Sequence, residues 1–301
     1  MLQTKYEEIV RVDEIGKASS RDVNDLFQFA KKERLSPANT DEKRVLLLGI
    51  DIQNDFLEGG SLGVPGSKED VKNLTKFIYR NMDRITQIAV SLDTHQPMQI
   101  FHSEWWRDEN GNFPEPFTII LAEDVKKGKW IPQAFPEKSV DYVVQLERAG
   151  KKQLCIWPYH CIEGTYGVGL ESQFANIVYF HSFVRKTSVK RIVKGNVPAT
   201  EMYGIFRPEY SKEEMTNTKL LTEVAAFDQI LIAGEAKSHC VLESVAQLVE
   251  FFEEKGISPS KITVLDDCMS PIPGYEQSTE EAYQRFQEAG VQIIPSKQLI
   301  L

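Results

Sequence analysis

The sequence predicts an α/β fold, a mostly parallel central sheet flanked by helices on both faces in a three-layer α/β/α arrangement. Short apolar runs rich in Val, Ile and Leu alternate along the chain with stretches of helical periodicity, a pattern typical of parallel sheets. Several of these runs end in polar residues. Folds of this class bind ligands beyond the carboxyl ends of their strands, so a functional site is expected at that edge.

The composition limits the classes of partner. The 301 residues are 42% hydrophobic and 26% charged, and the net charge of −9 offers no electrostatic footprint for nucleic acid or an acidic membrane surface. No apolar run reaches membrane-spanning length, and the charged N-terminus lacks a signal-peptide core. The four cysteines form neither a CxxC pair nor a disulfide framework. We therefore expect a cytoplasmic protein acting on a small molecule, without nucleic acid or membrane partners.

The chain divides into an N-terminal extension, residues 1–42, and a main domain, residues 43–301. The extension is expected to hold one short helix within residues 20–33, begun by a Ser/Asp cap and stopped near Pro37. Within the main domain, residues 103–153 mix Pro, Gly, aromatic and charged residues between two strand signals. Such a long irregular stretch is either a functional lid or a peripheral structural insertion.

The expected strands follow in order, with helical stretches between most of them. The apolar runs are RVLLLGIDIQ (44–53), TQIAVSLDTH (86–95), KQLCIWPYHC (152–161), VYFHSFVRK (178–186), RIVKG (191–195), FDQILIAG (227–234), KITVLDD (261–267) and VQIIPS (291–296). A Gly-rich loop, 54–67, follows the first run, and a helix is expected over 68–85.

Cys240 stands where one strand gives way to a helix. The run 227–234 is closed by Gly234, and apolar residues then recur at helical spacing from Val241 until Lys255 and Gly256 end the pattern. Unpaired backbone N–H groups and the positive end of the helix dipole favour a thiolate in such a first turn. The alternative for Cys240 is a small buried hydrophobic residue.

The other strand ends supply groups that a thiol nucleophile needs. Asp51 could act as its base, Lys194 could hold that base ionised, and the amides of the helix N-terminus could stabilise an oxyanion. Lys186 and Lys190 compete with Lys194 for this role. A second set of groups is suited to Zn²⁺, Fe²⁺ or Mn²⁺. Its members are Asp93, His95 and His160. Taken singly, each residue has another explanation. Asp51 could cap the following turn, and Asp93 and His95 could be a solvated loop pair. His160 could be a partly buried histidine with satisfied hydrogen bonds, and Lys194 a surface lysine.

Five blocks of sequence carry a family resemblance. They are LLGIDIQNDFLEGGSLGVPGS, LDTH, WPYHCIEGTYG, VKG and IAGEAKSHCVLES, in that order. In combination they resemble the isochorismatase-like cysteine hydrolases, specifically the nicotinamidase branch. The resemblance spans about residues 44–296, without the extension or the insertion. Members are commonly shorter than this chain.

The resemblance implies catalytic roles. Cys240 would attack the carboxamide carbon and release ammonia, leaving a thioester, while Asp51 would carry the proton and later activate water. Lys194 would complete the triad, since VKG follows a strand and precedes an aromatic-bearing loop as in the family. The N–H groups of Ala236 and Cys240 would form the oxyanion hole, with a cis peptide bond expected between Glu235 and Ala236. We count Glu235 among the substrate-binding positions.

The resemblance also implies a metal and a substrate-binding wall. Asp93, His95 and His160 would hold a divalent metal ion, Zn²⁺ with Fe²⁺ or Mn²⁺ as alternatives, which binds the pyridine nitrogen in nicotinamidases. Phe56 and Trp157 match positions whose rings pack against the substrate; otherwise they are core aromatics. Many relatives carry a histidine six residues after the D-x-H histidine. His102 lies seven residues after His95, and is either a fourth ligand or part of a shifted loop.

Some residues stay unassigned. His239 has counterparts in the family without a fixed role, its neighbour Ser238 replaces the more usual Asp, and His181 is expected to be structural. The tryptophans of the insertion would reshape the pocket mouth or build a subunit interface. They are Trp105, Trp106 and Trp130.

The leading hypothesis is a metal-containing cysteine amidohydrolase acting on nicotinamide or a similar small carboxamide. A related hydrolase of another amide or ureide is the first alternative, and related carbamoyl-amide hydrolases often lack the metal trio. Isochorismatase activity, a non-catalytic scaffold and a disulfide enzyme are further alternatives; the last lacks a second cysteine near Cys240. A homo-oligomer is expected.

Overall fold

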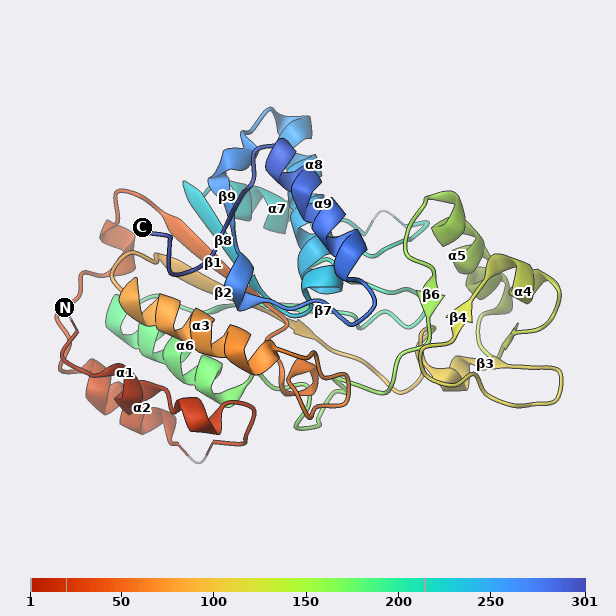
Figure 1. Cartoon of the computed structure of the whole chain (residues 1–301), viewed down its shortest axis with the longest axis horizontal. Coiled ribbons are helices and arrows are strands. Elements are labelled where there is room, and N and C mark those ends of the chain that lie inside the picture. The colour runs from red at the N-terminus through yellow and green to blue at the C-terminus, as the bar shows by residue number, and fades with distance from the viewer. Residues whose placement is uncertain (1, 20, 214) are drawn as a thin grey trace.

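A six-stranded parallel sheet forms the centre of the protein (Figure 1). The structure, a computed structural model, describes residues 2–19, 21–213 and 215–301. The strand order is β10-β9-β8-β1-β2-β7, and every neighbouring pair is parallel. The strands are β1 (Val45–Ile50), β2 (Gln87–Asp93), β7 (Lys190–Lys194), β8 (Gln229–Gly234), β9 (Ile262–Leu265) and β10 (Gln292–Ile294).

Helices cover both faces of this sheet, so the predicted fold class is confirmed. One face carries α1 (Tyr6–Ile9), α2 (Val23–Ala30), α3 (Ser67–Arg80) and α6 (Ser172–Arg185), and the other carries α7 (Thr218–Ala225), α8 (Leu242–Lys255) and α9 (Glu276–Glu288) (Figure 1). Alternate residues of β1 enter opposite cores: Leu47 packs with α3 and α6, whereas Leu46 and Leu48 pack on the side of α8. A buried parallel strand is apolar on both faces for this reason.

Two expected strands differ from the structure. Residues 178–185 belong to α6 and Lys186 is its C-cap, so this segment is not a strand. The prediction is wrong because this helix is buried on several sides and its apolar run lacks clear amphipathic spacing. The segment 152–161 contains only β6 (Leu154–Cys155), which lies outside the central sheet. It pairs antiparallel with β4 (Ile119–Ile120).

The extension packs against α6. Helix α2 is capped by Asp22, whose side chain accepts a hydrogen bond from the Asn24 N–H, and Ser20 of the expected cap lies outside the described residues. The expected single helix is joined by a second, α1. Arg185, at the end of α6, is only 1% exposed and forms an ion pair with Asp41, which anchors the end of the extension to the main domain.

Residues 103–153 form a folded unit at one end of the molecule (Figure 1). It contains β3 (Trp106–Arg107), β5 (Ile131–Pro132), α4 (Ala122–Lys126) and α5 (Pro136–Arg148), and β3 pairs antiparallel with β5. Trp105 and Trp106 are fully buried, and the indole N–H of Trp105 donates to Ser139 Oγ of α5 over 2.9 Å. Both tryptophans belong to the core cluster that also contains Leu46 and Leu48 of β1, so they pack the unit onto the main domain rather than forming a pocket mouth or a subunit interface.

Within the described ranges, no helix combines the length and the apolar character that crossing a membrane requires.

Candidate active site

Four adjacent strands bring the predicted residues to one edge of the sheet. Asp51 follows β1, Asp93 ends β2, Lys194 ends β7, and Cys240 lies six residues beyond the end of β8. Asp93 and Lys194 are direct register partners between β2 and β7. Because all four strands are parallel, their carboxyl ends meet at this edge, as the sequence predicts.

An acid, an ammonium and a sulfur meet there. Lys194 Nζ lies 2.9 Å from Asp51 Oδ2, 3.1 Å from Asp93 Oδ1 and 3.6 Å from Cys240 Sγ. It also donates to the Met202 carbonyl over 3.0 Å. Carboxylate oxygens of Asp51 and Asp93 and the sulfur of Cys240 lie within 4.8 Å of one another. Lys194 therefore bridges the two carboxylates and the thiol.

Ser91 holds the carboxylate of Asp51 in place. The Asp51 N–H donates to Ser91 Oγ over 2.9 Å, and this hydroxyl donates back to Asp51 Oδ1 over 2.6 Å. The arrangement leaves Asp51 Oδ2 for Lys194. Asp51 has a φ of 46°, an uncommon backbone conformation that turns the chain directly after β1.

The surroundings of Lys194, Asp51 and Asp93 shift the pKa values of these three groups in different ways. Burial works against the ammonium of Lys194, but Asp51 and Asp93 outweigh it and raise the pKa of Lys194 well above its usual range. Burial raises the pKa of Asp51, and Lys194 opposes that shift. For Asp93, His95 and Lys194 outweigh burial and lower the pKa of the carboxyl. Lys194 is therefore charged at neutral pH, and of the two acids Asp51 binds a proton more readily.

Cys240 lies in a π-helical turn, Lys237–Val241, that leads into α8. Burial raises the pKa of its thiol well above the usual value, with Asp51 and Asp93 adding to this effect against Lys194. The lowered pKa expected from the helix start is therefore wrong: loss of solvent, together with two nearby carboxylates, outweighs the ammonium of Lys194. The resting sulfur is a thiol, which needs a base.

Backbone amides near the sulfur are available for an oxyanion. The peptide bond between Glu235 and Ala236 is cis, as the resemblance implies. Ala236 lines the pocket beside Cys240, and the described part of the chain supplies no acceptor for its N–H. The Ala236 N–H is therefore available for the oxyanion hole that the resemblance implies, and the contribution of the Cys240 amide stays a prediction.

Asp93, His95 and His160 form a compact set of metal-ligating groups. One ligand atom from each lies within 4.8 Å of the others. Nδ1 of His95 bonds the Gly195 carbonyl at 2.9 Å, and Nδ1 of His160 bonds the Pro158 carbonyl at 2.7 Å. A ring whose Nδ1 donates to a carbonyl presents the lone pair of Nε2, the form that binds metals.

The residues therefore fit a divalent ion. Burial lowers the pKa of His160 to about 3, so this imidazole is neutral at physiological pH, as a ligand must be. His95 Nε2 and Asp93 Oδ2 lie 3.0 Å apart, close enough for both atoms to bind one divalent ion. One carboxylate with two imidazoles suits Zn²⁺ and related ions.

His102 lies next to this set but is not one of its members. Its ring centroid is 6.1 Å from that of His95 and 6.4 Å from that of His160. Nδ1 bonds the Pro97 carbonyl at 3.0 Å, and Nε2 is buried without a partner among the described residues. Its available nitrogen thus resembles those of the other two histidines, at a greater distance.

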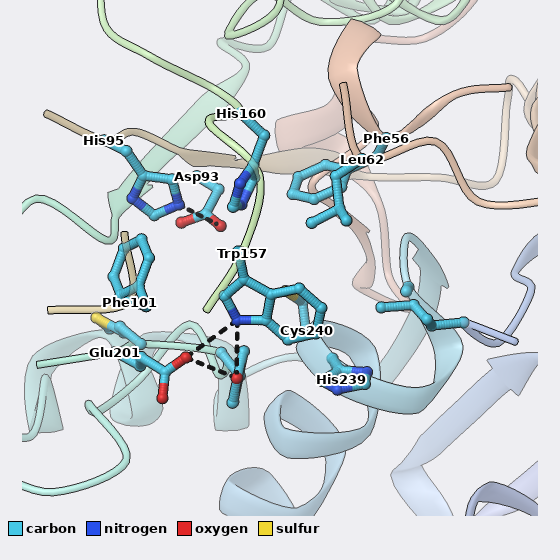
Figure 2. A pocket seen from close by; sticks show the side chains of 14 residues that line it. Phe56, Leu62, Asp93, His95, Phe101, Trp157, His160, Glu201, His239 and Cys240 are labelled. Atoms are coloured by element: carbon cyan, nitrogen blue, oxygen red, sulfur yellow. Dashed lines mark hydrogen bonds and ion pairs between the residues drawn. The ribbon is translucent and has the colours of Figure 1, made fainter. Parts of the chain in front are cut away.

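Aromatic side chains wall the pocket that contains Cys240 and the three metal-ligating residues (Figure 2). Phe56 and Trp157 are part of this wall, as the sequence predicts, and the Phe56 ring packs edge-on against His160. Sequence reasoning assigned no role to several further lining residues. These are Leu62, Phe101, Glu201, Met202, Tyr203, His239 and Ile272.

Glu235 is the exception among the predicted substrate-binding residues, because unlike Phe56 and Trp157 it is not part of the pocket wall. It is 1% exposed and lies behind the cis peptide bond, against Asp70 and Ser270. Ser270 Oγ donates to Asp70 Oδ2 over 2.6 Å. Burial and the neighbouring Asp70 raise the pKa of Glu235 well above its usual value, and burial raises the pKa of Asp70 to about 6.

The competing residues lie elsewhere. Lys190 is at the opposite end of β7, where it pairs with Glu223, and Lys186 caps the C-terminus of α6. His181 is buried in α6 with Nε2 bonded to the Ile85 carbonyl at 2.9 Å. His239 lines the pocket, with Nδ1 2.8 Å from Ser238 Oγ. None of the first three approaches Cys240.

Comparisons with known proteins point in one direction. No protein-family model matches the chain. The curated nicotinamidase of Saccharomyces cerevisiae is 25% identical over 229 residues, covering 75% of this chain and 88% of the relative. The curated nicotinamidase of Escherichia coli is 21% identical over 253 residues, covering 82% of this chain and 92% of the relative.

Solved structures share the fold. The yeast nicotinamidase bound to the inhibitor nicotinaldehyde matches with a TM-score of 0.59 at 20% identity, covering 83% of this chain and 99% of that chain. A nicotinamidase and pyrazinamidase of Acinetobacter baumanii matches with a TM-score of 0.59 at 21% identity, covering 87% and 100%. The pyrazinamidase of Pyrococcus horikoshii in complex with zinc matches with a TM-score of 0.50 at 18% identity, covering 84% and 99%.

Proposed function

We propose that this chain, an isochorismatase-like cysteine hydrolase of the nicotinamidase branch, hydrolyses nicotinamide or a similar small heteroaromatic carboxamide to the acid and ammonia. The observation that carries the proposal is the convergence of Asp51, Lys194 and Cys240 beside a pocket that also contains Asp93, His95 and His160. The curated relatives at this similarity are nicotinamidases.

The acyl-transfer step uses the resting thiol. Asp51 takes the proton from Cys240 as the sulfur attacks the carboxamide carbon, and the N–H groups of Ala236 and Cys240 stabilise the resulting oxyanion. Asp51 then gives its proton to the leaving nitrogen, the C–N bond breaks, and ammonia departs from a thioester. Lys194, held between Asp51 and Asp93, keeps Asp51 in reach throughout and offsets the negative charge of the sulfur.

Hydrolysis of the thioester reuses the same acid. Asp51 takes a proton from a water molecule whose oxygen attacks the thioester carbon. The C–S bond then breaks, the proton returns to the sulfur, and the carboxylic acid product is released. One carboxyl group thus serves as base and then as acid in each half of the reaction, which suits a group whose pKa burial has raised.

The metal-ligating set has a separate part in the proposal. Asp93, His95 and His160 would hold a divalent ion, for which we propose Zn²⁺, with Fe²⁺ and Mn²⁺ as alternatives. The bound ion would coordinate the ring nitrogen and so orient the substrate. Zinc is present in the structure of the Pyrococcus horikoshii pyrazinamidase. Phe56 and Trp157 would enclose the substrate ring from the pocket wall.

The test is ammonia release from a panel of amides by purified protein, with the metal content of the same sample measured. The panel holds nicotinamide, pyrazinamide, benzamide, which lacks the ring nitrogen, and a carbamoyl amide. The proposal expects the highest kcat/KM for the heteroaromatic amides and no release with Cys240→Ala. Preference for the carbamoyl amide, or benzamide turned over as well as nicotinamide, would contradict it.

A further inference from the structure

The insertion is bonded to the pocket without forming part of it. Among the described residues, none from 103–153 lines the pocket. Tyr142 of α5 is nevertheless buried against Glu201, a pocket-lining residue in the loop after β7. The Glu201 N–H donates to Tyr142 Oη over 2.9 Å, and that hydroxyl points back towards Glu201 Oε2 at 3.5 Å.

One oxygen of Glu201 holds two aromatic side chains of the pocket. Oε1 accepts a hydrogen bond from the Tyr203 hydroxyl at 2.7 Å and from the indole N–H of Trp157 at 3.1 Å (Figure 2). Glu201, Trp157 and Tyr203 are all less than 10% exposed. The single N–H of the indole also reaches the Tyr203 hydroxyl at 3.3 Å. Because Oε1 holds that hydroxyl as well, the orientation of the indole depends on where Oε1 lies, both directly and through Tyr203.

Glu201 acts here as a neutral group. Burial raises its pKa to about 8, so the acid form predominates at neutral pH, and the pocket wall gains no charge from it. A glutamine at this position would keep a carbonyl oxygen for the two donors, whereas a leucine would fill similar space without an acceptor.

We propose that Glu201 is a positioning residue that fixes the indole of Trp157 against the substrate ring, and that Tyr142 ties Glu201 to the insertion. The insertion then acts on substrate binding through the chain Tyr142, Glu201, Trp157 without contacting the substrate. The proposal rests on the proposed function for the identity of the substrate, but not for the coupling between the insertion and Trp157.

The experiment compares four single variants and the double variant Tyr142→Phe/Glu201→Leu of the metal-loaded protein, with nicotinamide as substrate. Glu201→Leu removes the acceptor, Glu201→Gln keeps it, and Tyr142→Phe cuts the link to the insertion. Tyr6→Phe is the matched control. It removes the hydroxyl of another buried tyrosine, bonded to Thr75 Oγ1 at 2.8 Å, in the core between the sheet, α3 and α6.

A misplaced indole weakens ring binding, so KM should rise about tenfold in Glu201→Leu while kcat stays within about twofold. Tyr142→Phe should raise KM by a smaller factor, and the double variant should be no worse than Glu201→Leu alone, because both act on one chain of contacts. Glu201→Gln should recover most of the loss, and Tyr6→Phe should match the wild type. An unchanged KM, a loss confined to kcat, or additive effects would overturn the proposal.

A second readout needs no turnover. The emission of Trp157, isolated by subtracting the Trp157→Phe spectrum, should shift in Glu201→Leu and in Tyr142→Phe but not in Tyr6→Phe. If no amide were hydrolysed by the wild type, the proposed function would fail while this shift still supported the inference. An unshifted emission in both variants would overturn the inference, whatever the activity. If Glu201→Leu did not fold, Tyr142→Phe alone would decide by the same two measures.

Discussion

Lys194 Nζ lies 2.9 Å from Asp51 Oδ2, and both side chains are wholly removed from solvent. The same ammonium lies 3.1 Å from Asp93 Oδ1. One buried cation thus joins the acid beside the thiol to the carboxylate of the metal-ligating set. This contact couples the nucleophile and its acid to the metal-ligating residues.

The first prediction concerns that cation. Lys194→Met keeps the length of the side chain but leaves two buried carboxylates without their partner, and removing one member of a buried ion pair costs about 3–5 kcal/mol. We expect loss of that size in the free energy of unfolding, measured with urea, together with loss of ammonia release.

Lys190→Met is its control on the same strand. Lys190 pairs with Glu223 where both side chains are about a third or more exposed, and such pairs contribute roughly 0–1 kcal/mol. Equal destabilisation by the two variants would contradict the account of Lys194.

A second prediction separates the histidines by metal content. His160→Ala removes one of three ligands and should abolish stoichiometric metal binding, measured by elemental analysis after dialysis. His102→Ala should reduce affinity less, because His102 lies outside the compact set. His181→Ala changes a buried histidine of α6 that is not among the metal-ligating residues, so this variant should retain the metal. Full metal retention by His160→Ala would refute the assignment of the ligands.

The third prediction concerns Asp70. Burial raises its pKa from 3.8 to about 6, so between these pH values the folded state holds a proton that the unfolded state has lost. The free energy of unfolding therefore falls as pH rises through this window. The side-chain oxygen of Asn in Asp70→Asn can still accept the hydrogen bond from Ser270, but this variant has no carboxyl to titrate. Its free energy of unfolding should therefore not fall in this way. Its stability relative to the wild type should increase by up to ~3 kcal/mol from pH 4 to pH 7.

The control for Asp70→Asn is Glu254→Gln, a change on an exposed position of α8. Urea unfolding of both variants and the wild type at several pH values measures the effect. For Glu254→Gln, the difference in unfolding free energy from the wild type should not change with pH. The same result for Asp70→Asn would contradict the raised pKa of Asp70.

The parallel fold and the sheet edge that carries the candidate site could be predicted because both depend on local sequence patterns. Buried parallel strands read as apolar runs, and their ends bear Asp51, Asp93 and Lys194. Parallel strands necessarily bring these ends together. The position of Cys240 after β8 follows from the same rule.

Other features depend on contacts that no local pattern records. The helix α6 is apolar on several sides because α2, α3 and the sheet all pack around it, and its sequence therefore resembles a buried strand. The pKa of Cys240 is set by burial and by carboxylates from two other strands. Glu201 reaches the pocket through a loop held by the insertion, so its role could not be assigned from its neighbours in sequence.

The central claim, that Cys240 is the nucleophile of an amide hydrolysis, is tested most directly by trapping the acyl-enzyme. Protein mixed with nicotinamide, quenched in acid within one turnover and digested should yield a pyridine-3-carbonyl adduct on the peptide that contains Cys240, detected by mass spectrometry. The Cys240→Ala variant should yield neither adduct nor ammonia. An adduct on another residue, or undiminished ammonia release by Cys240→Ala, would contradict the account.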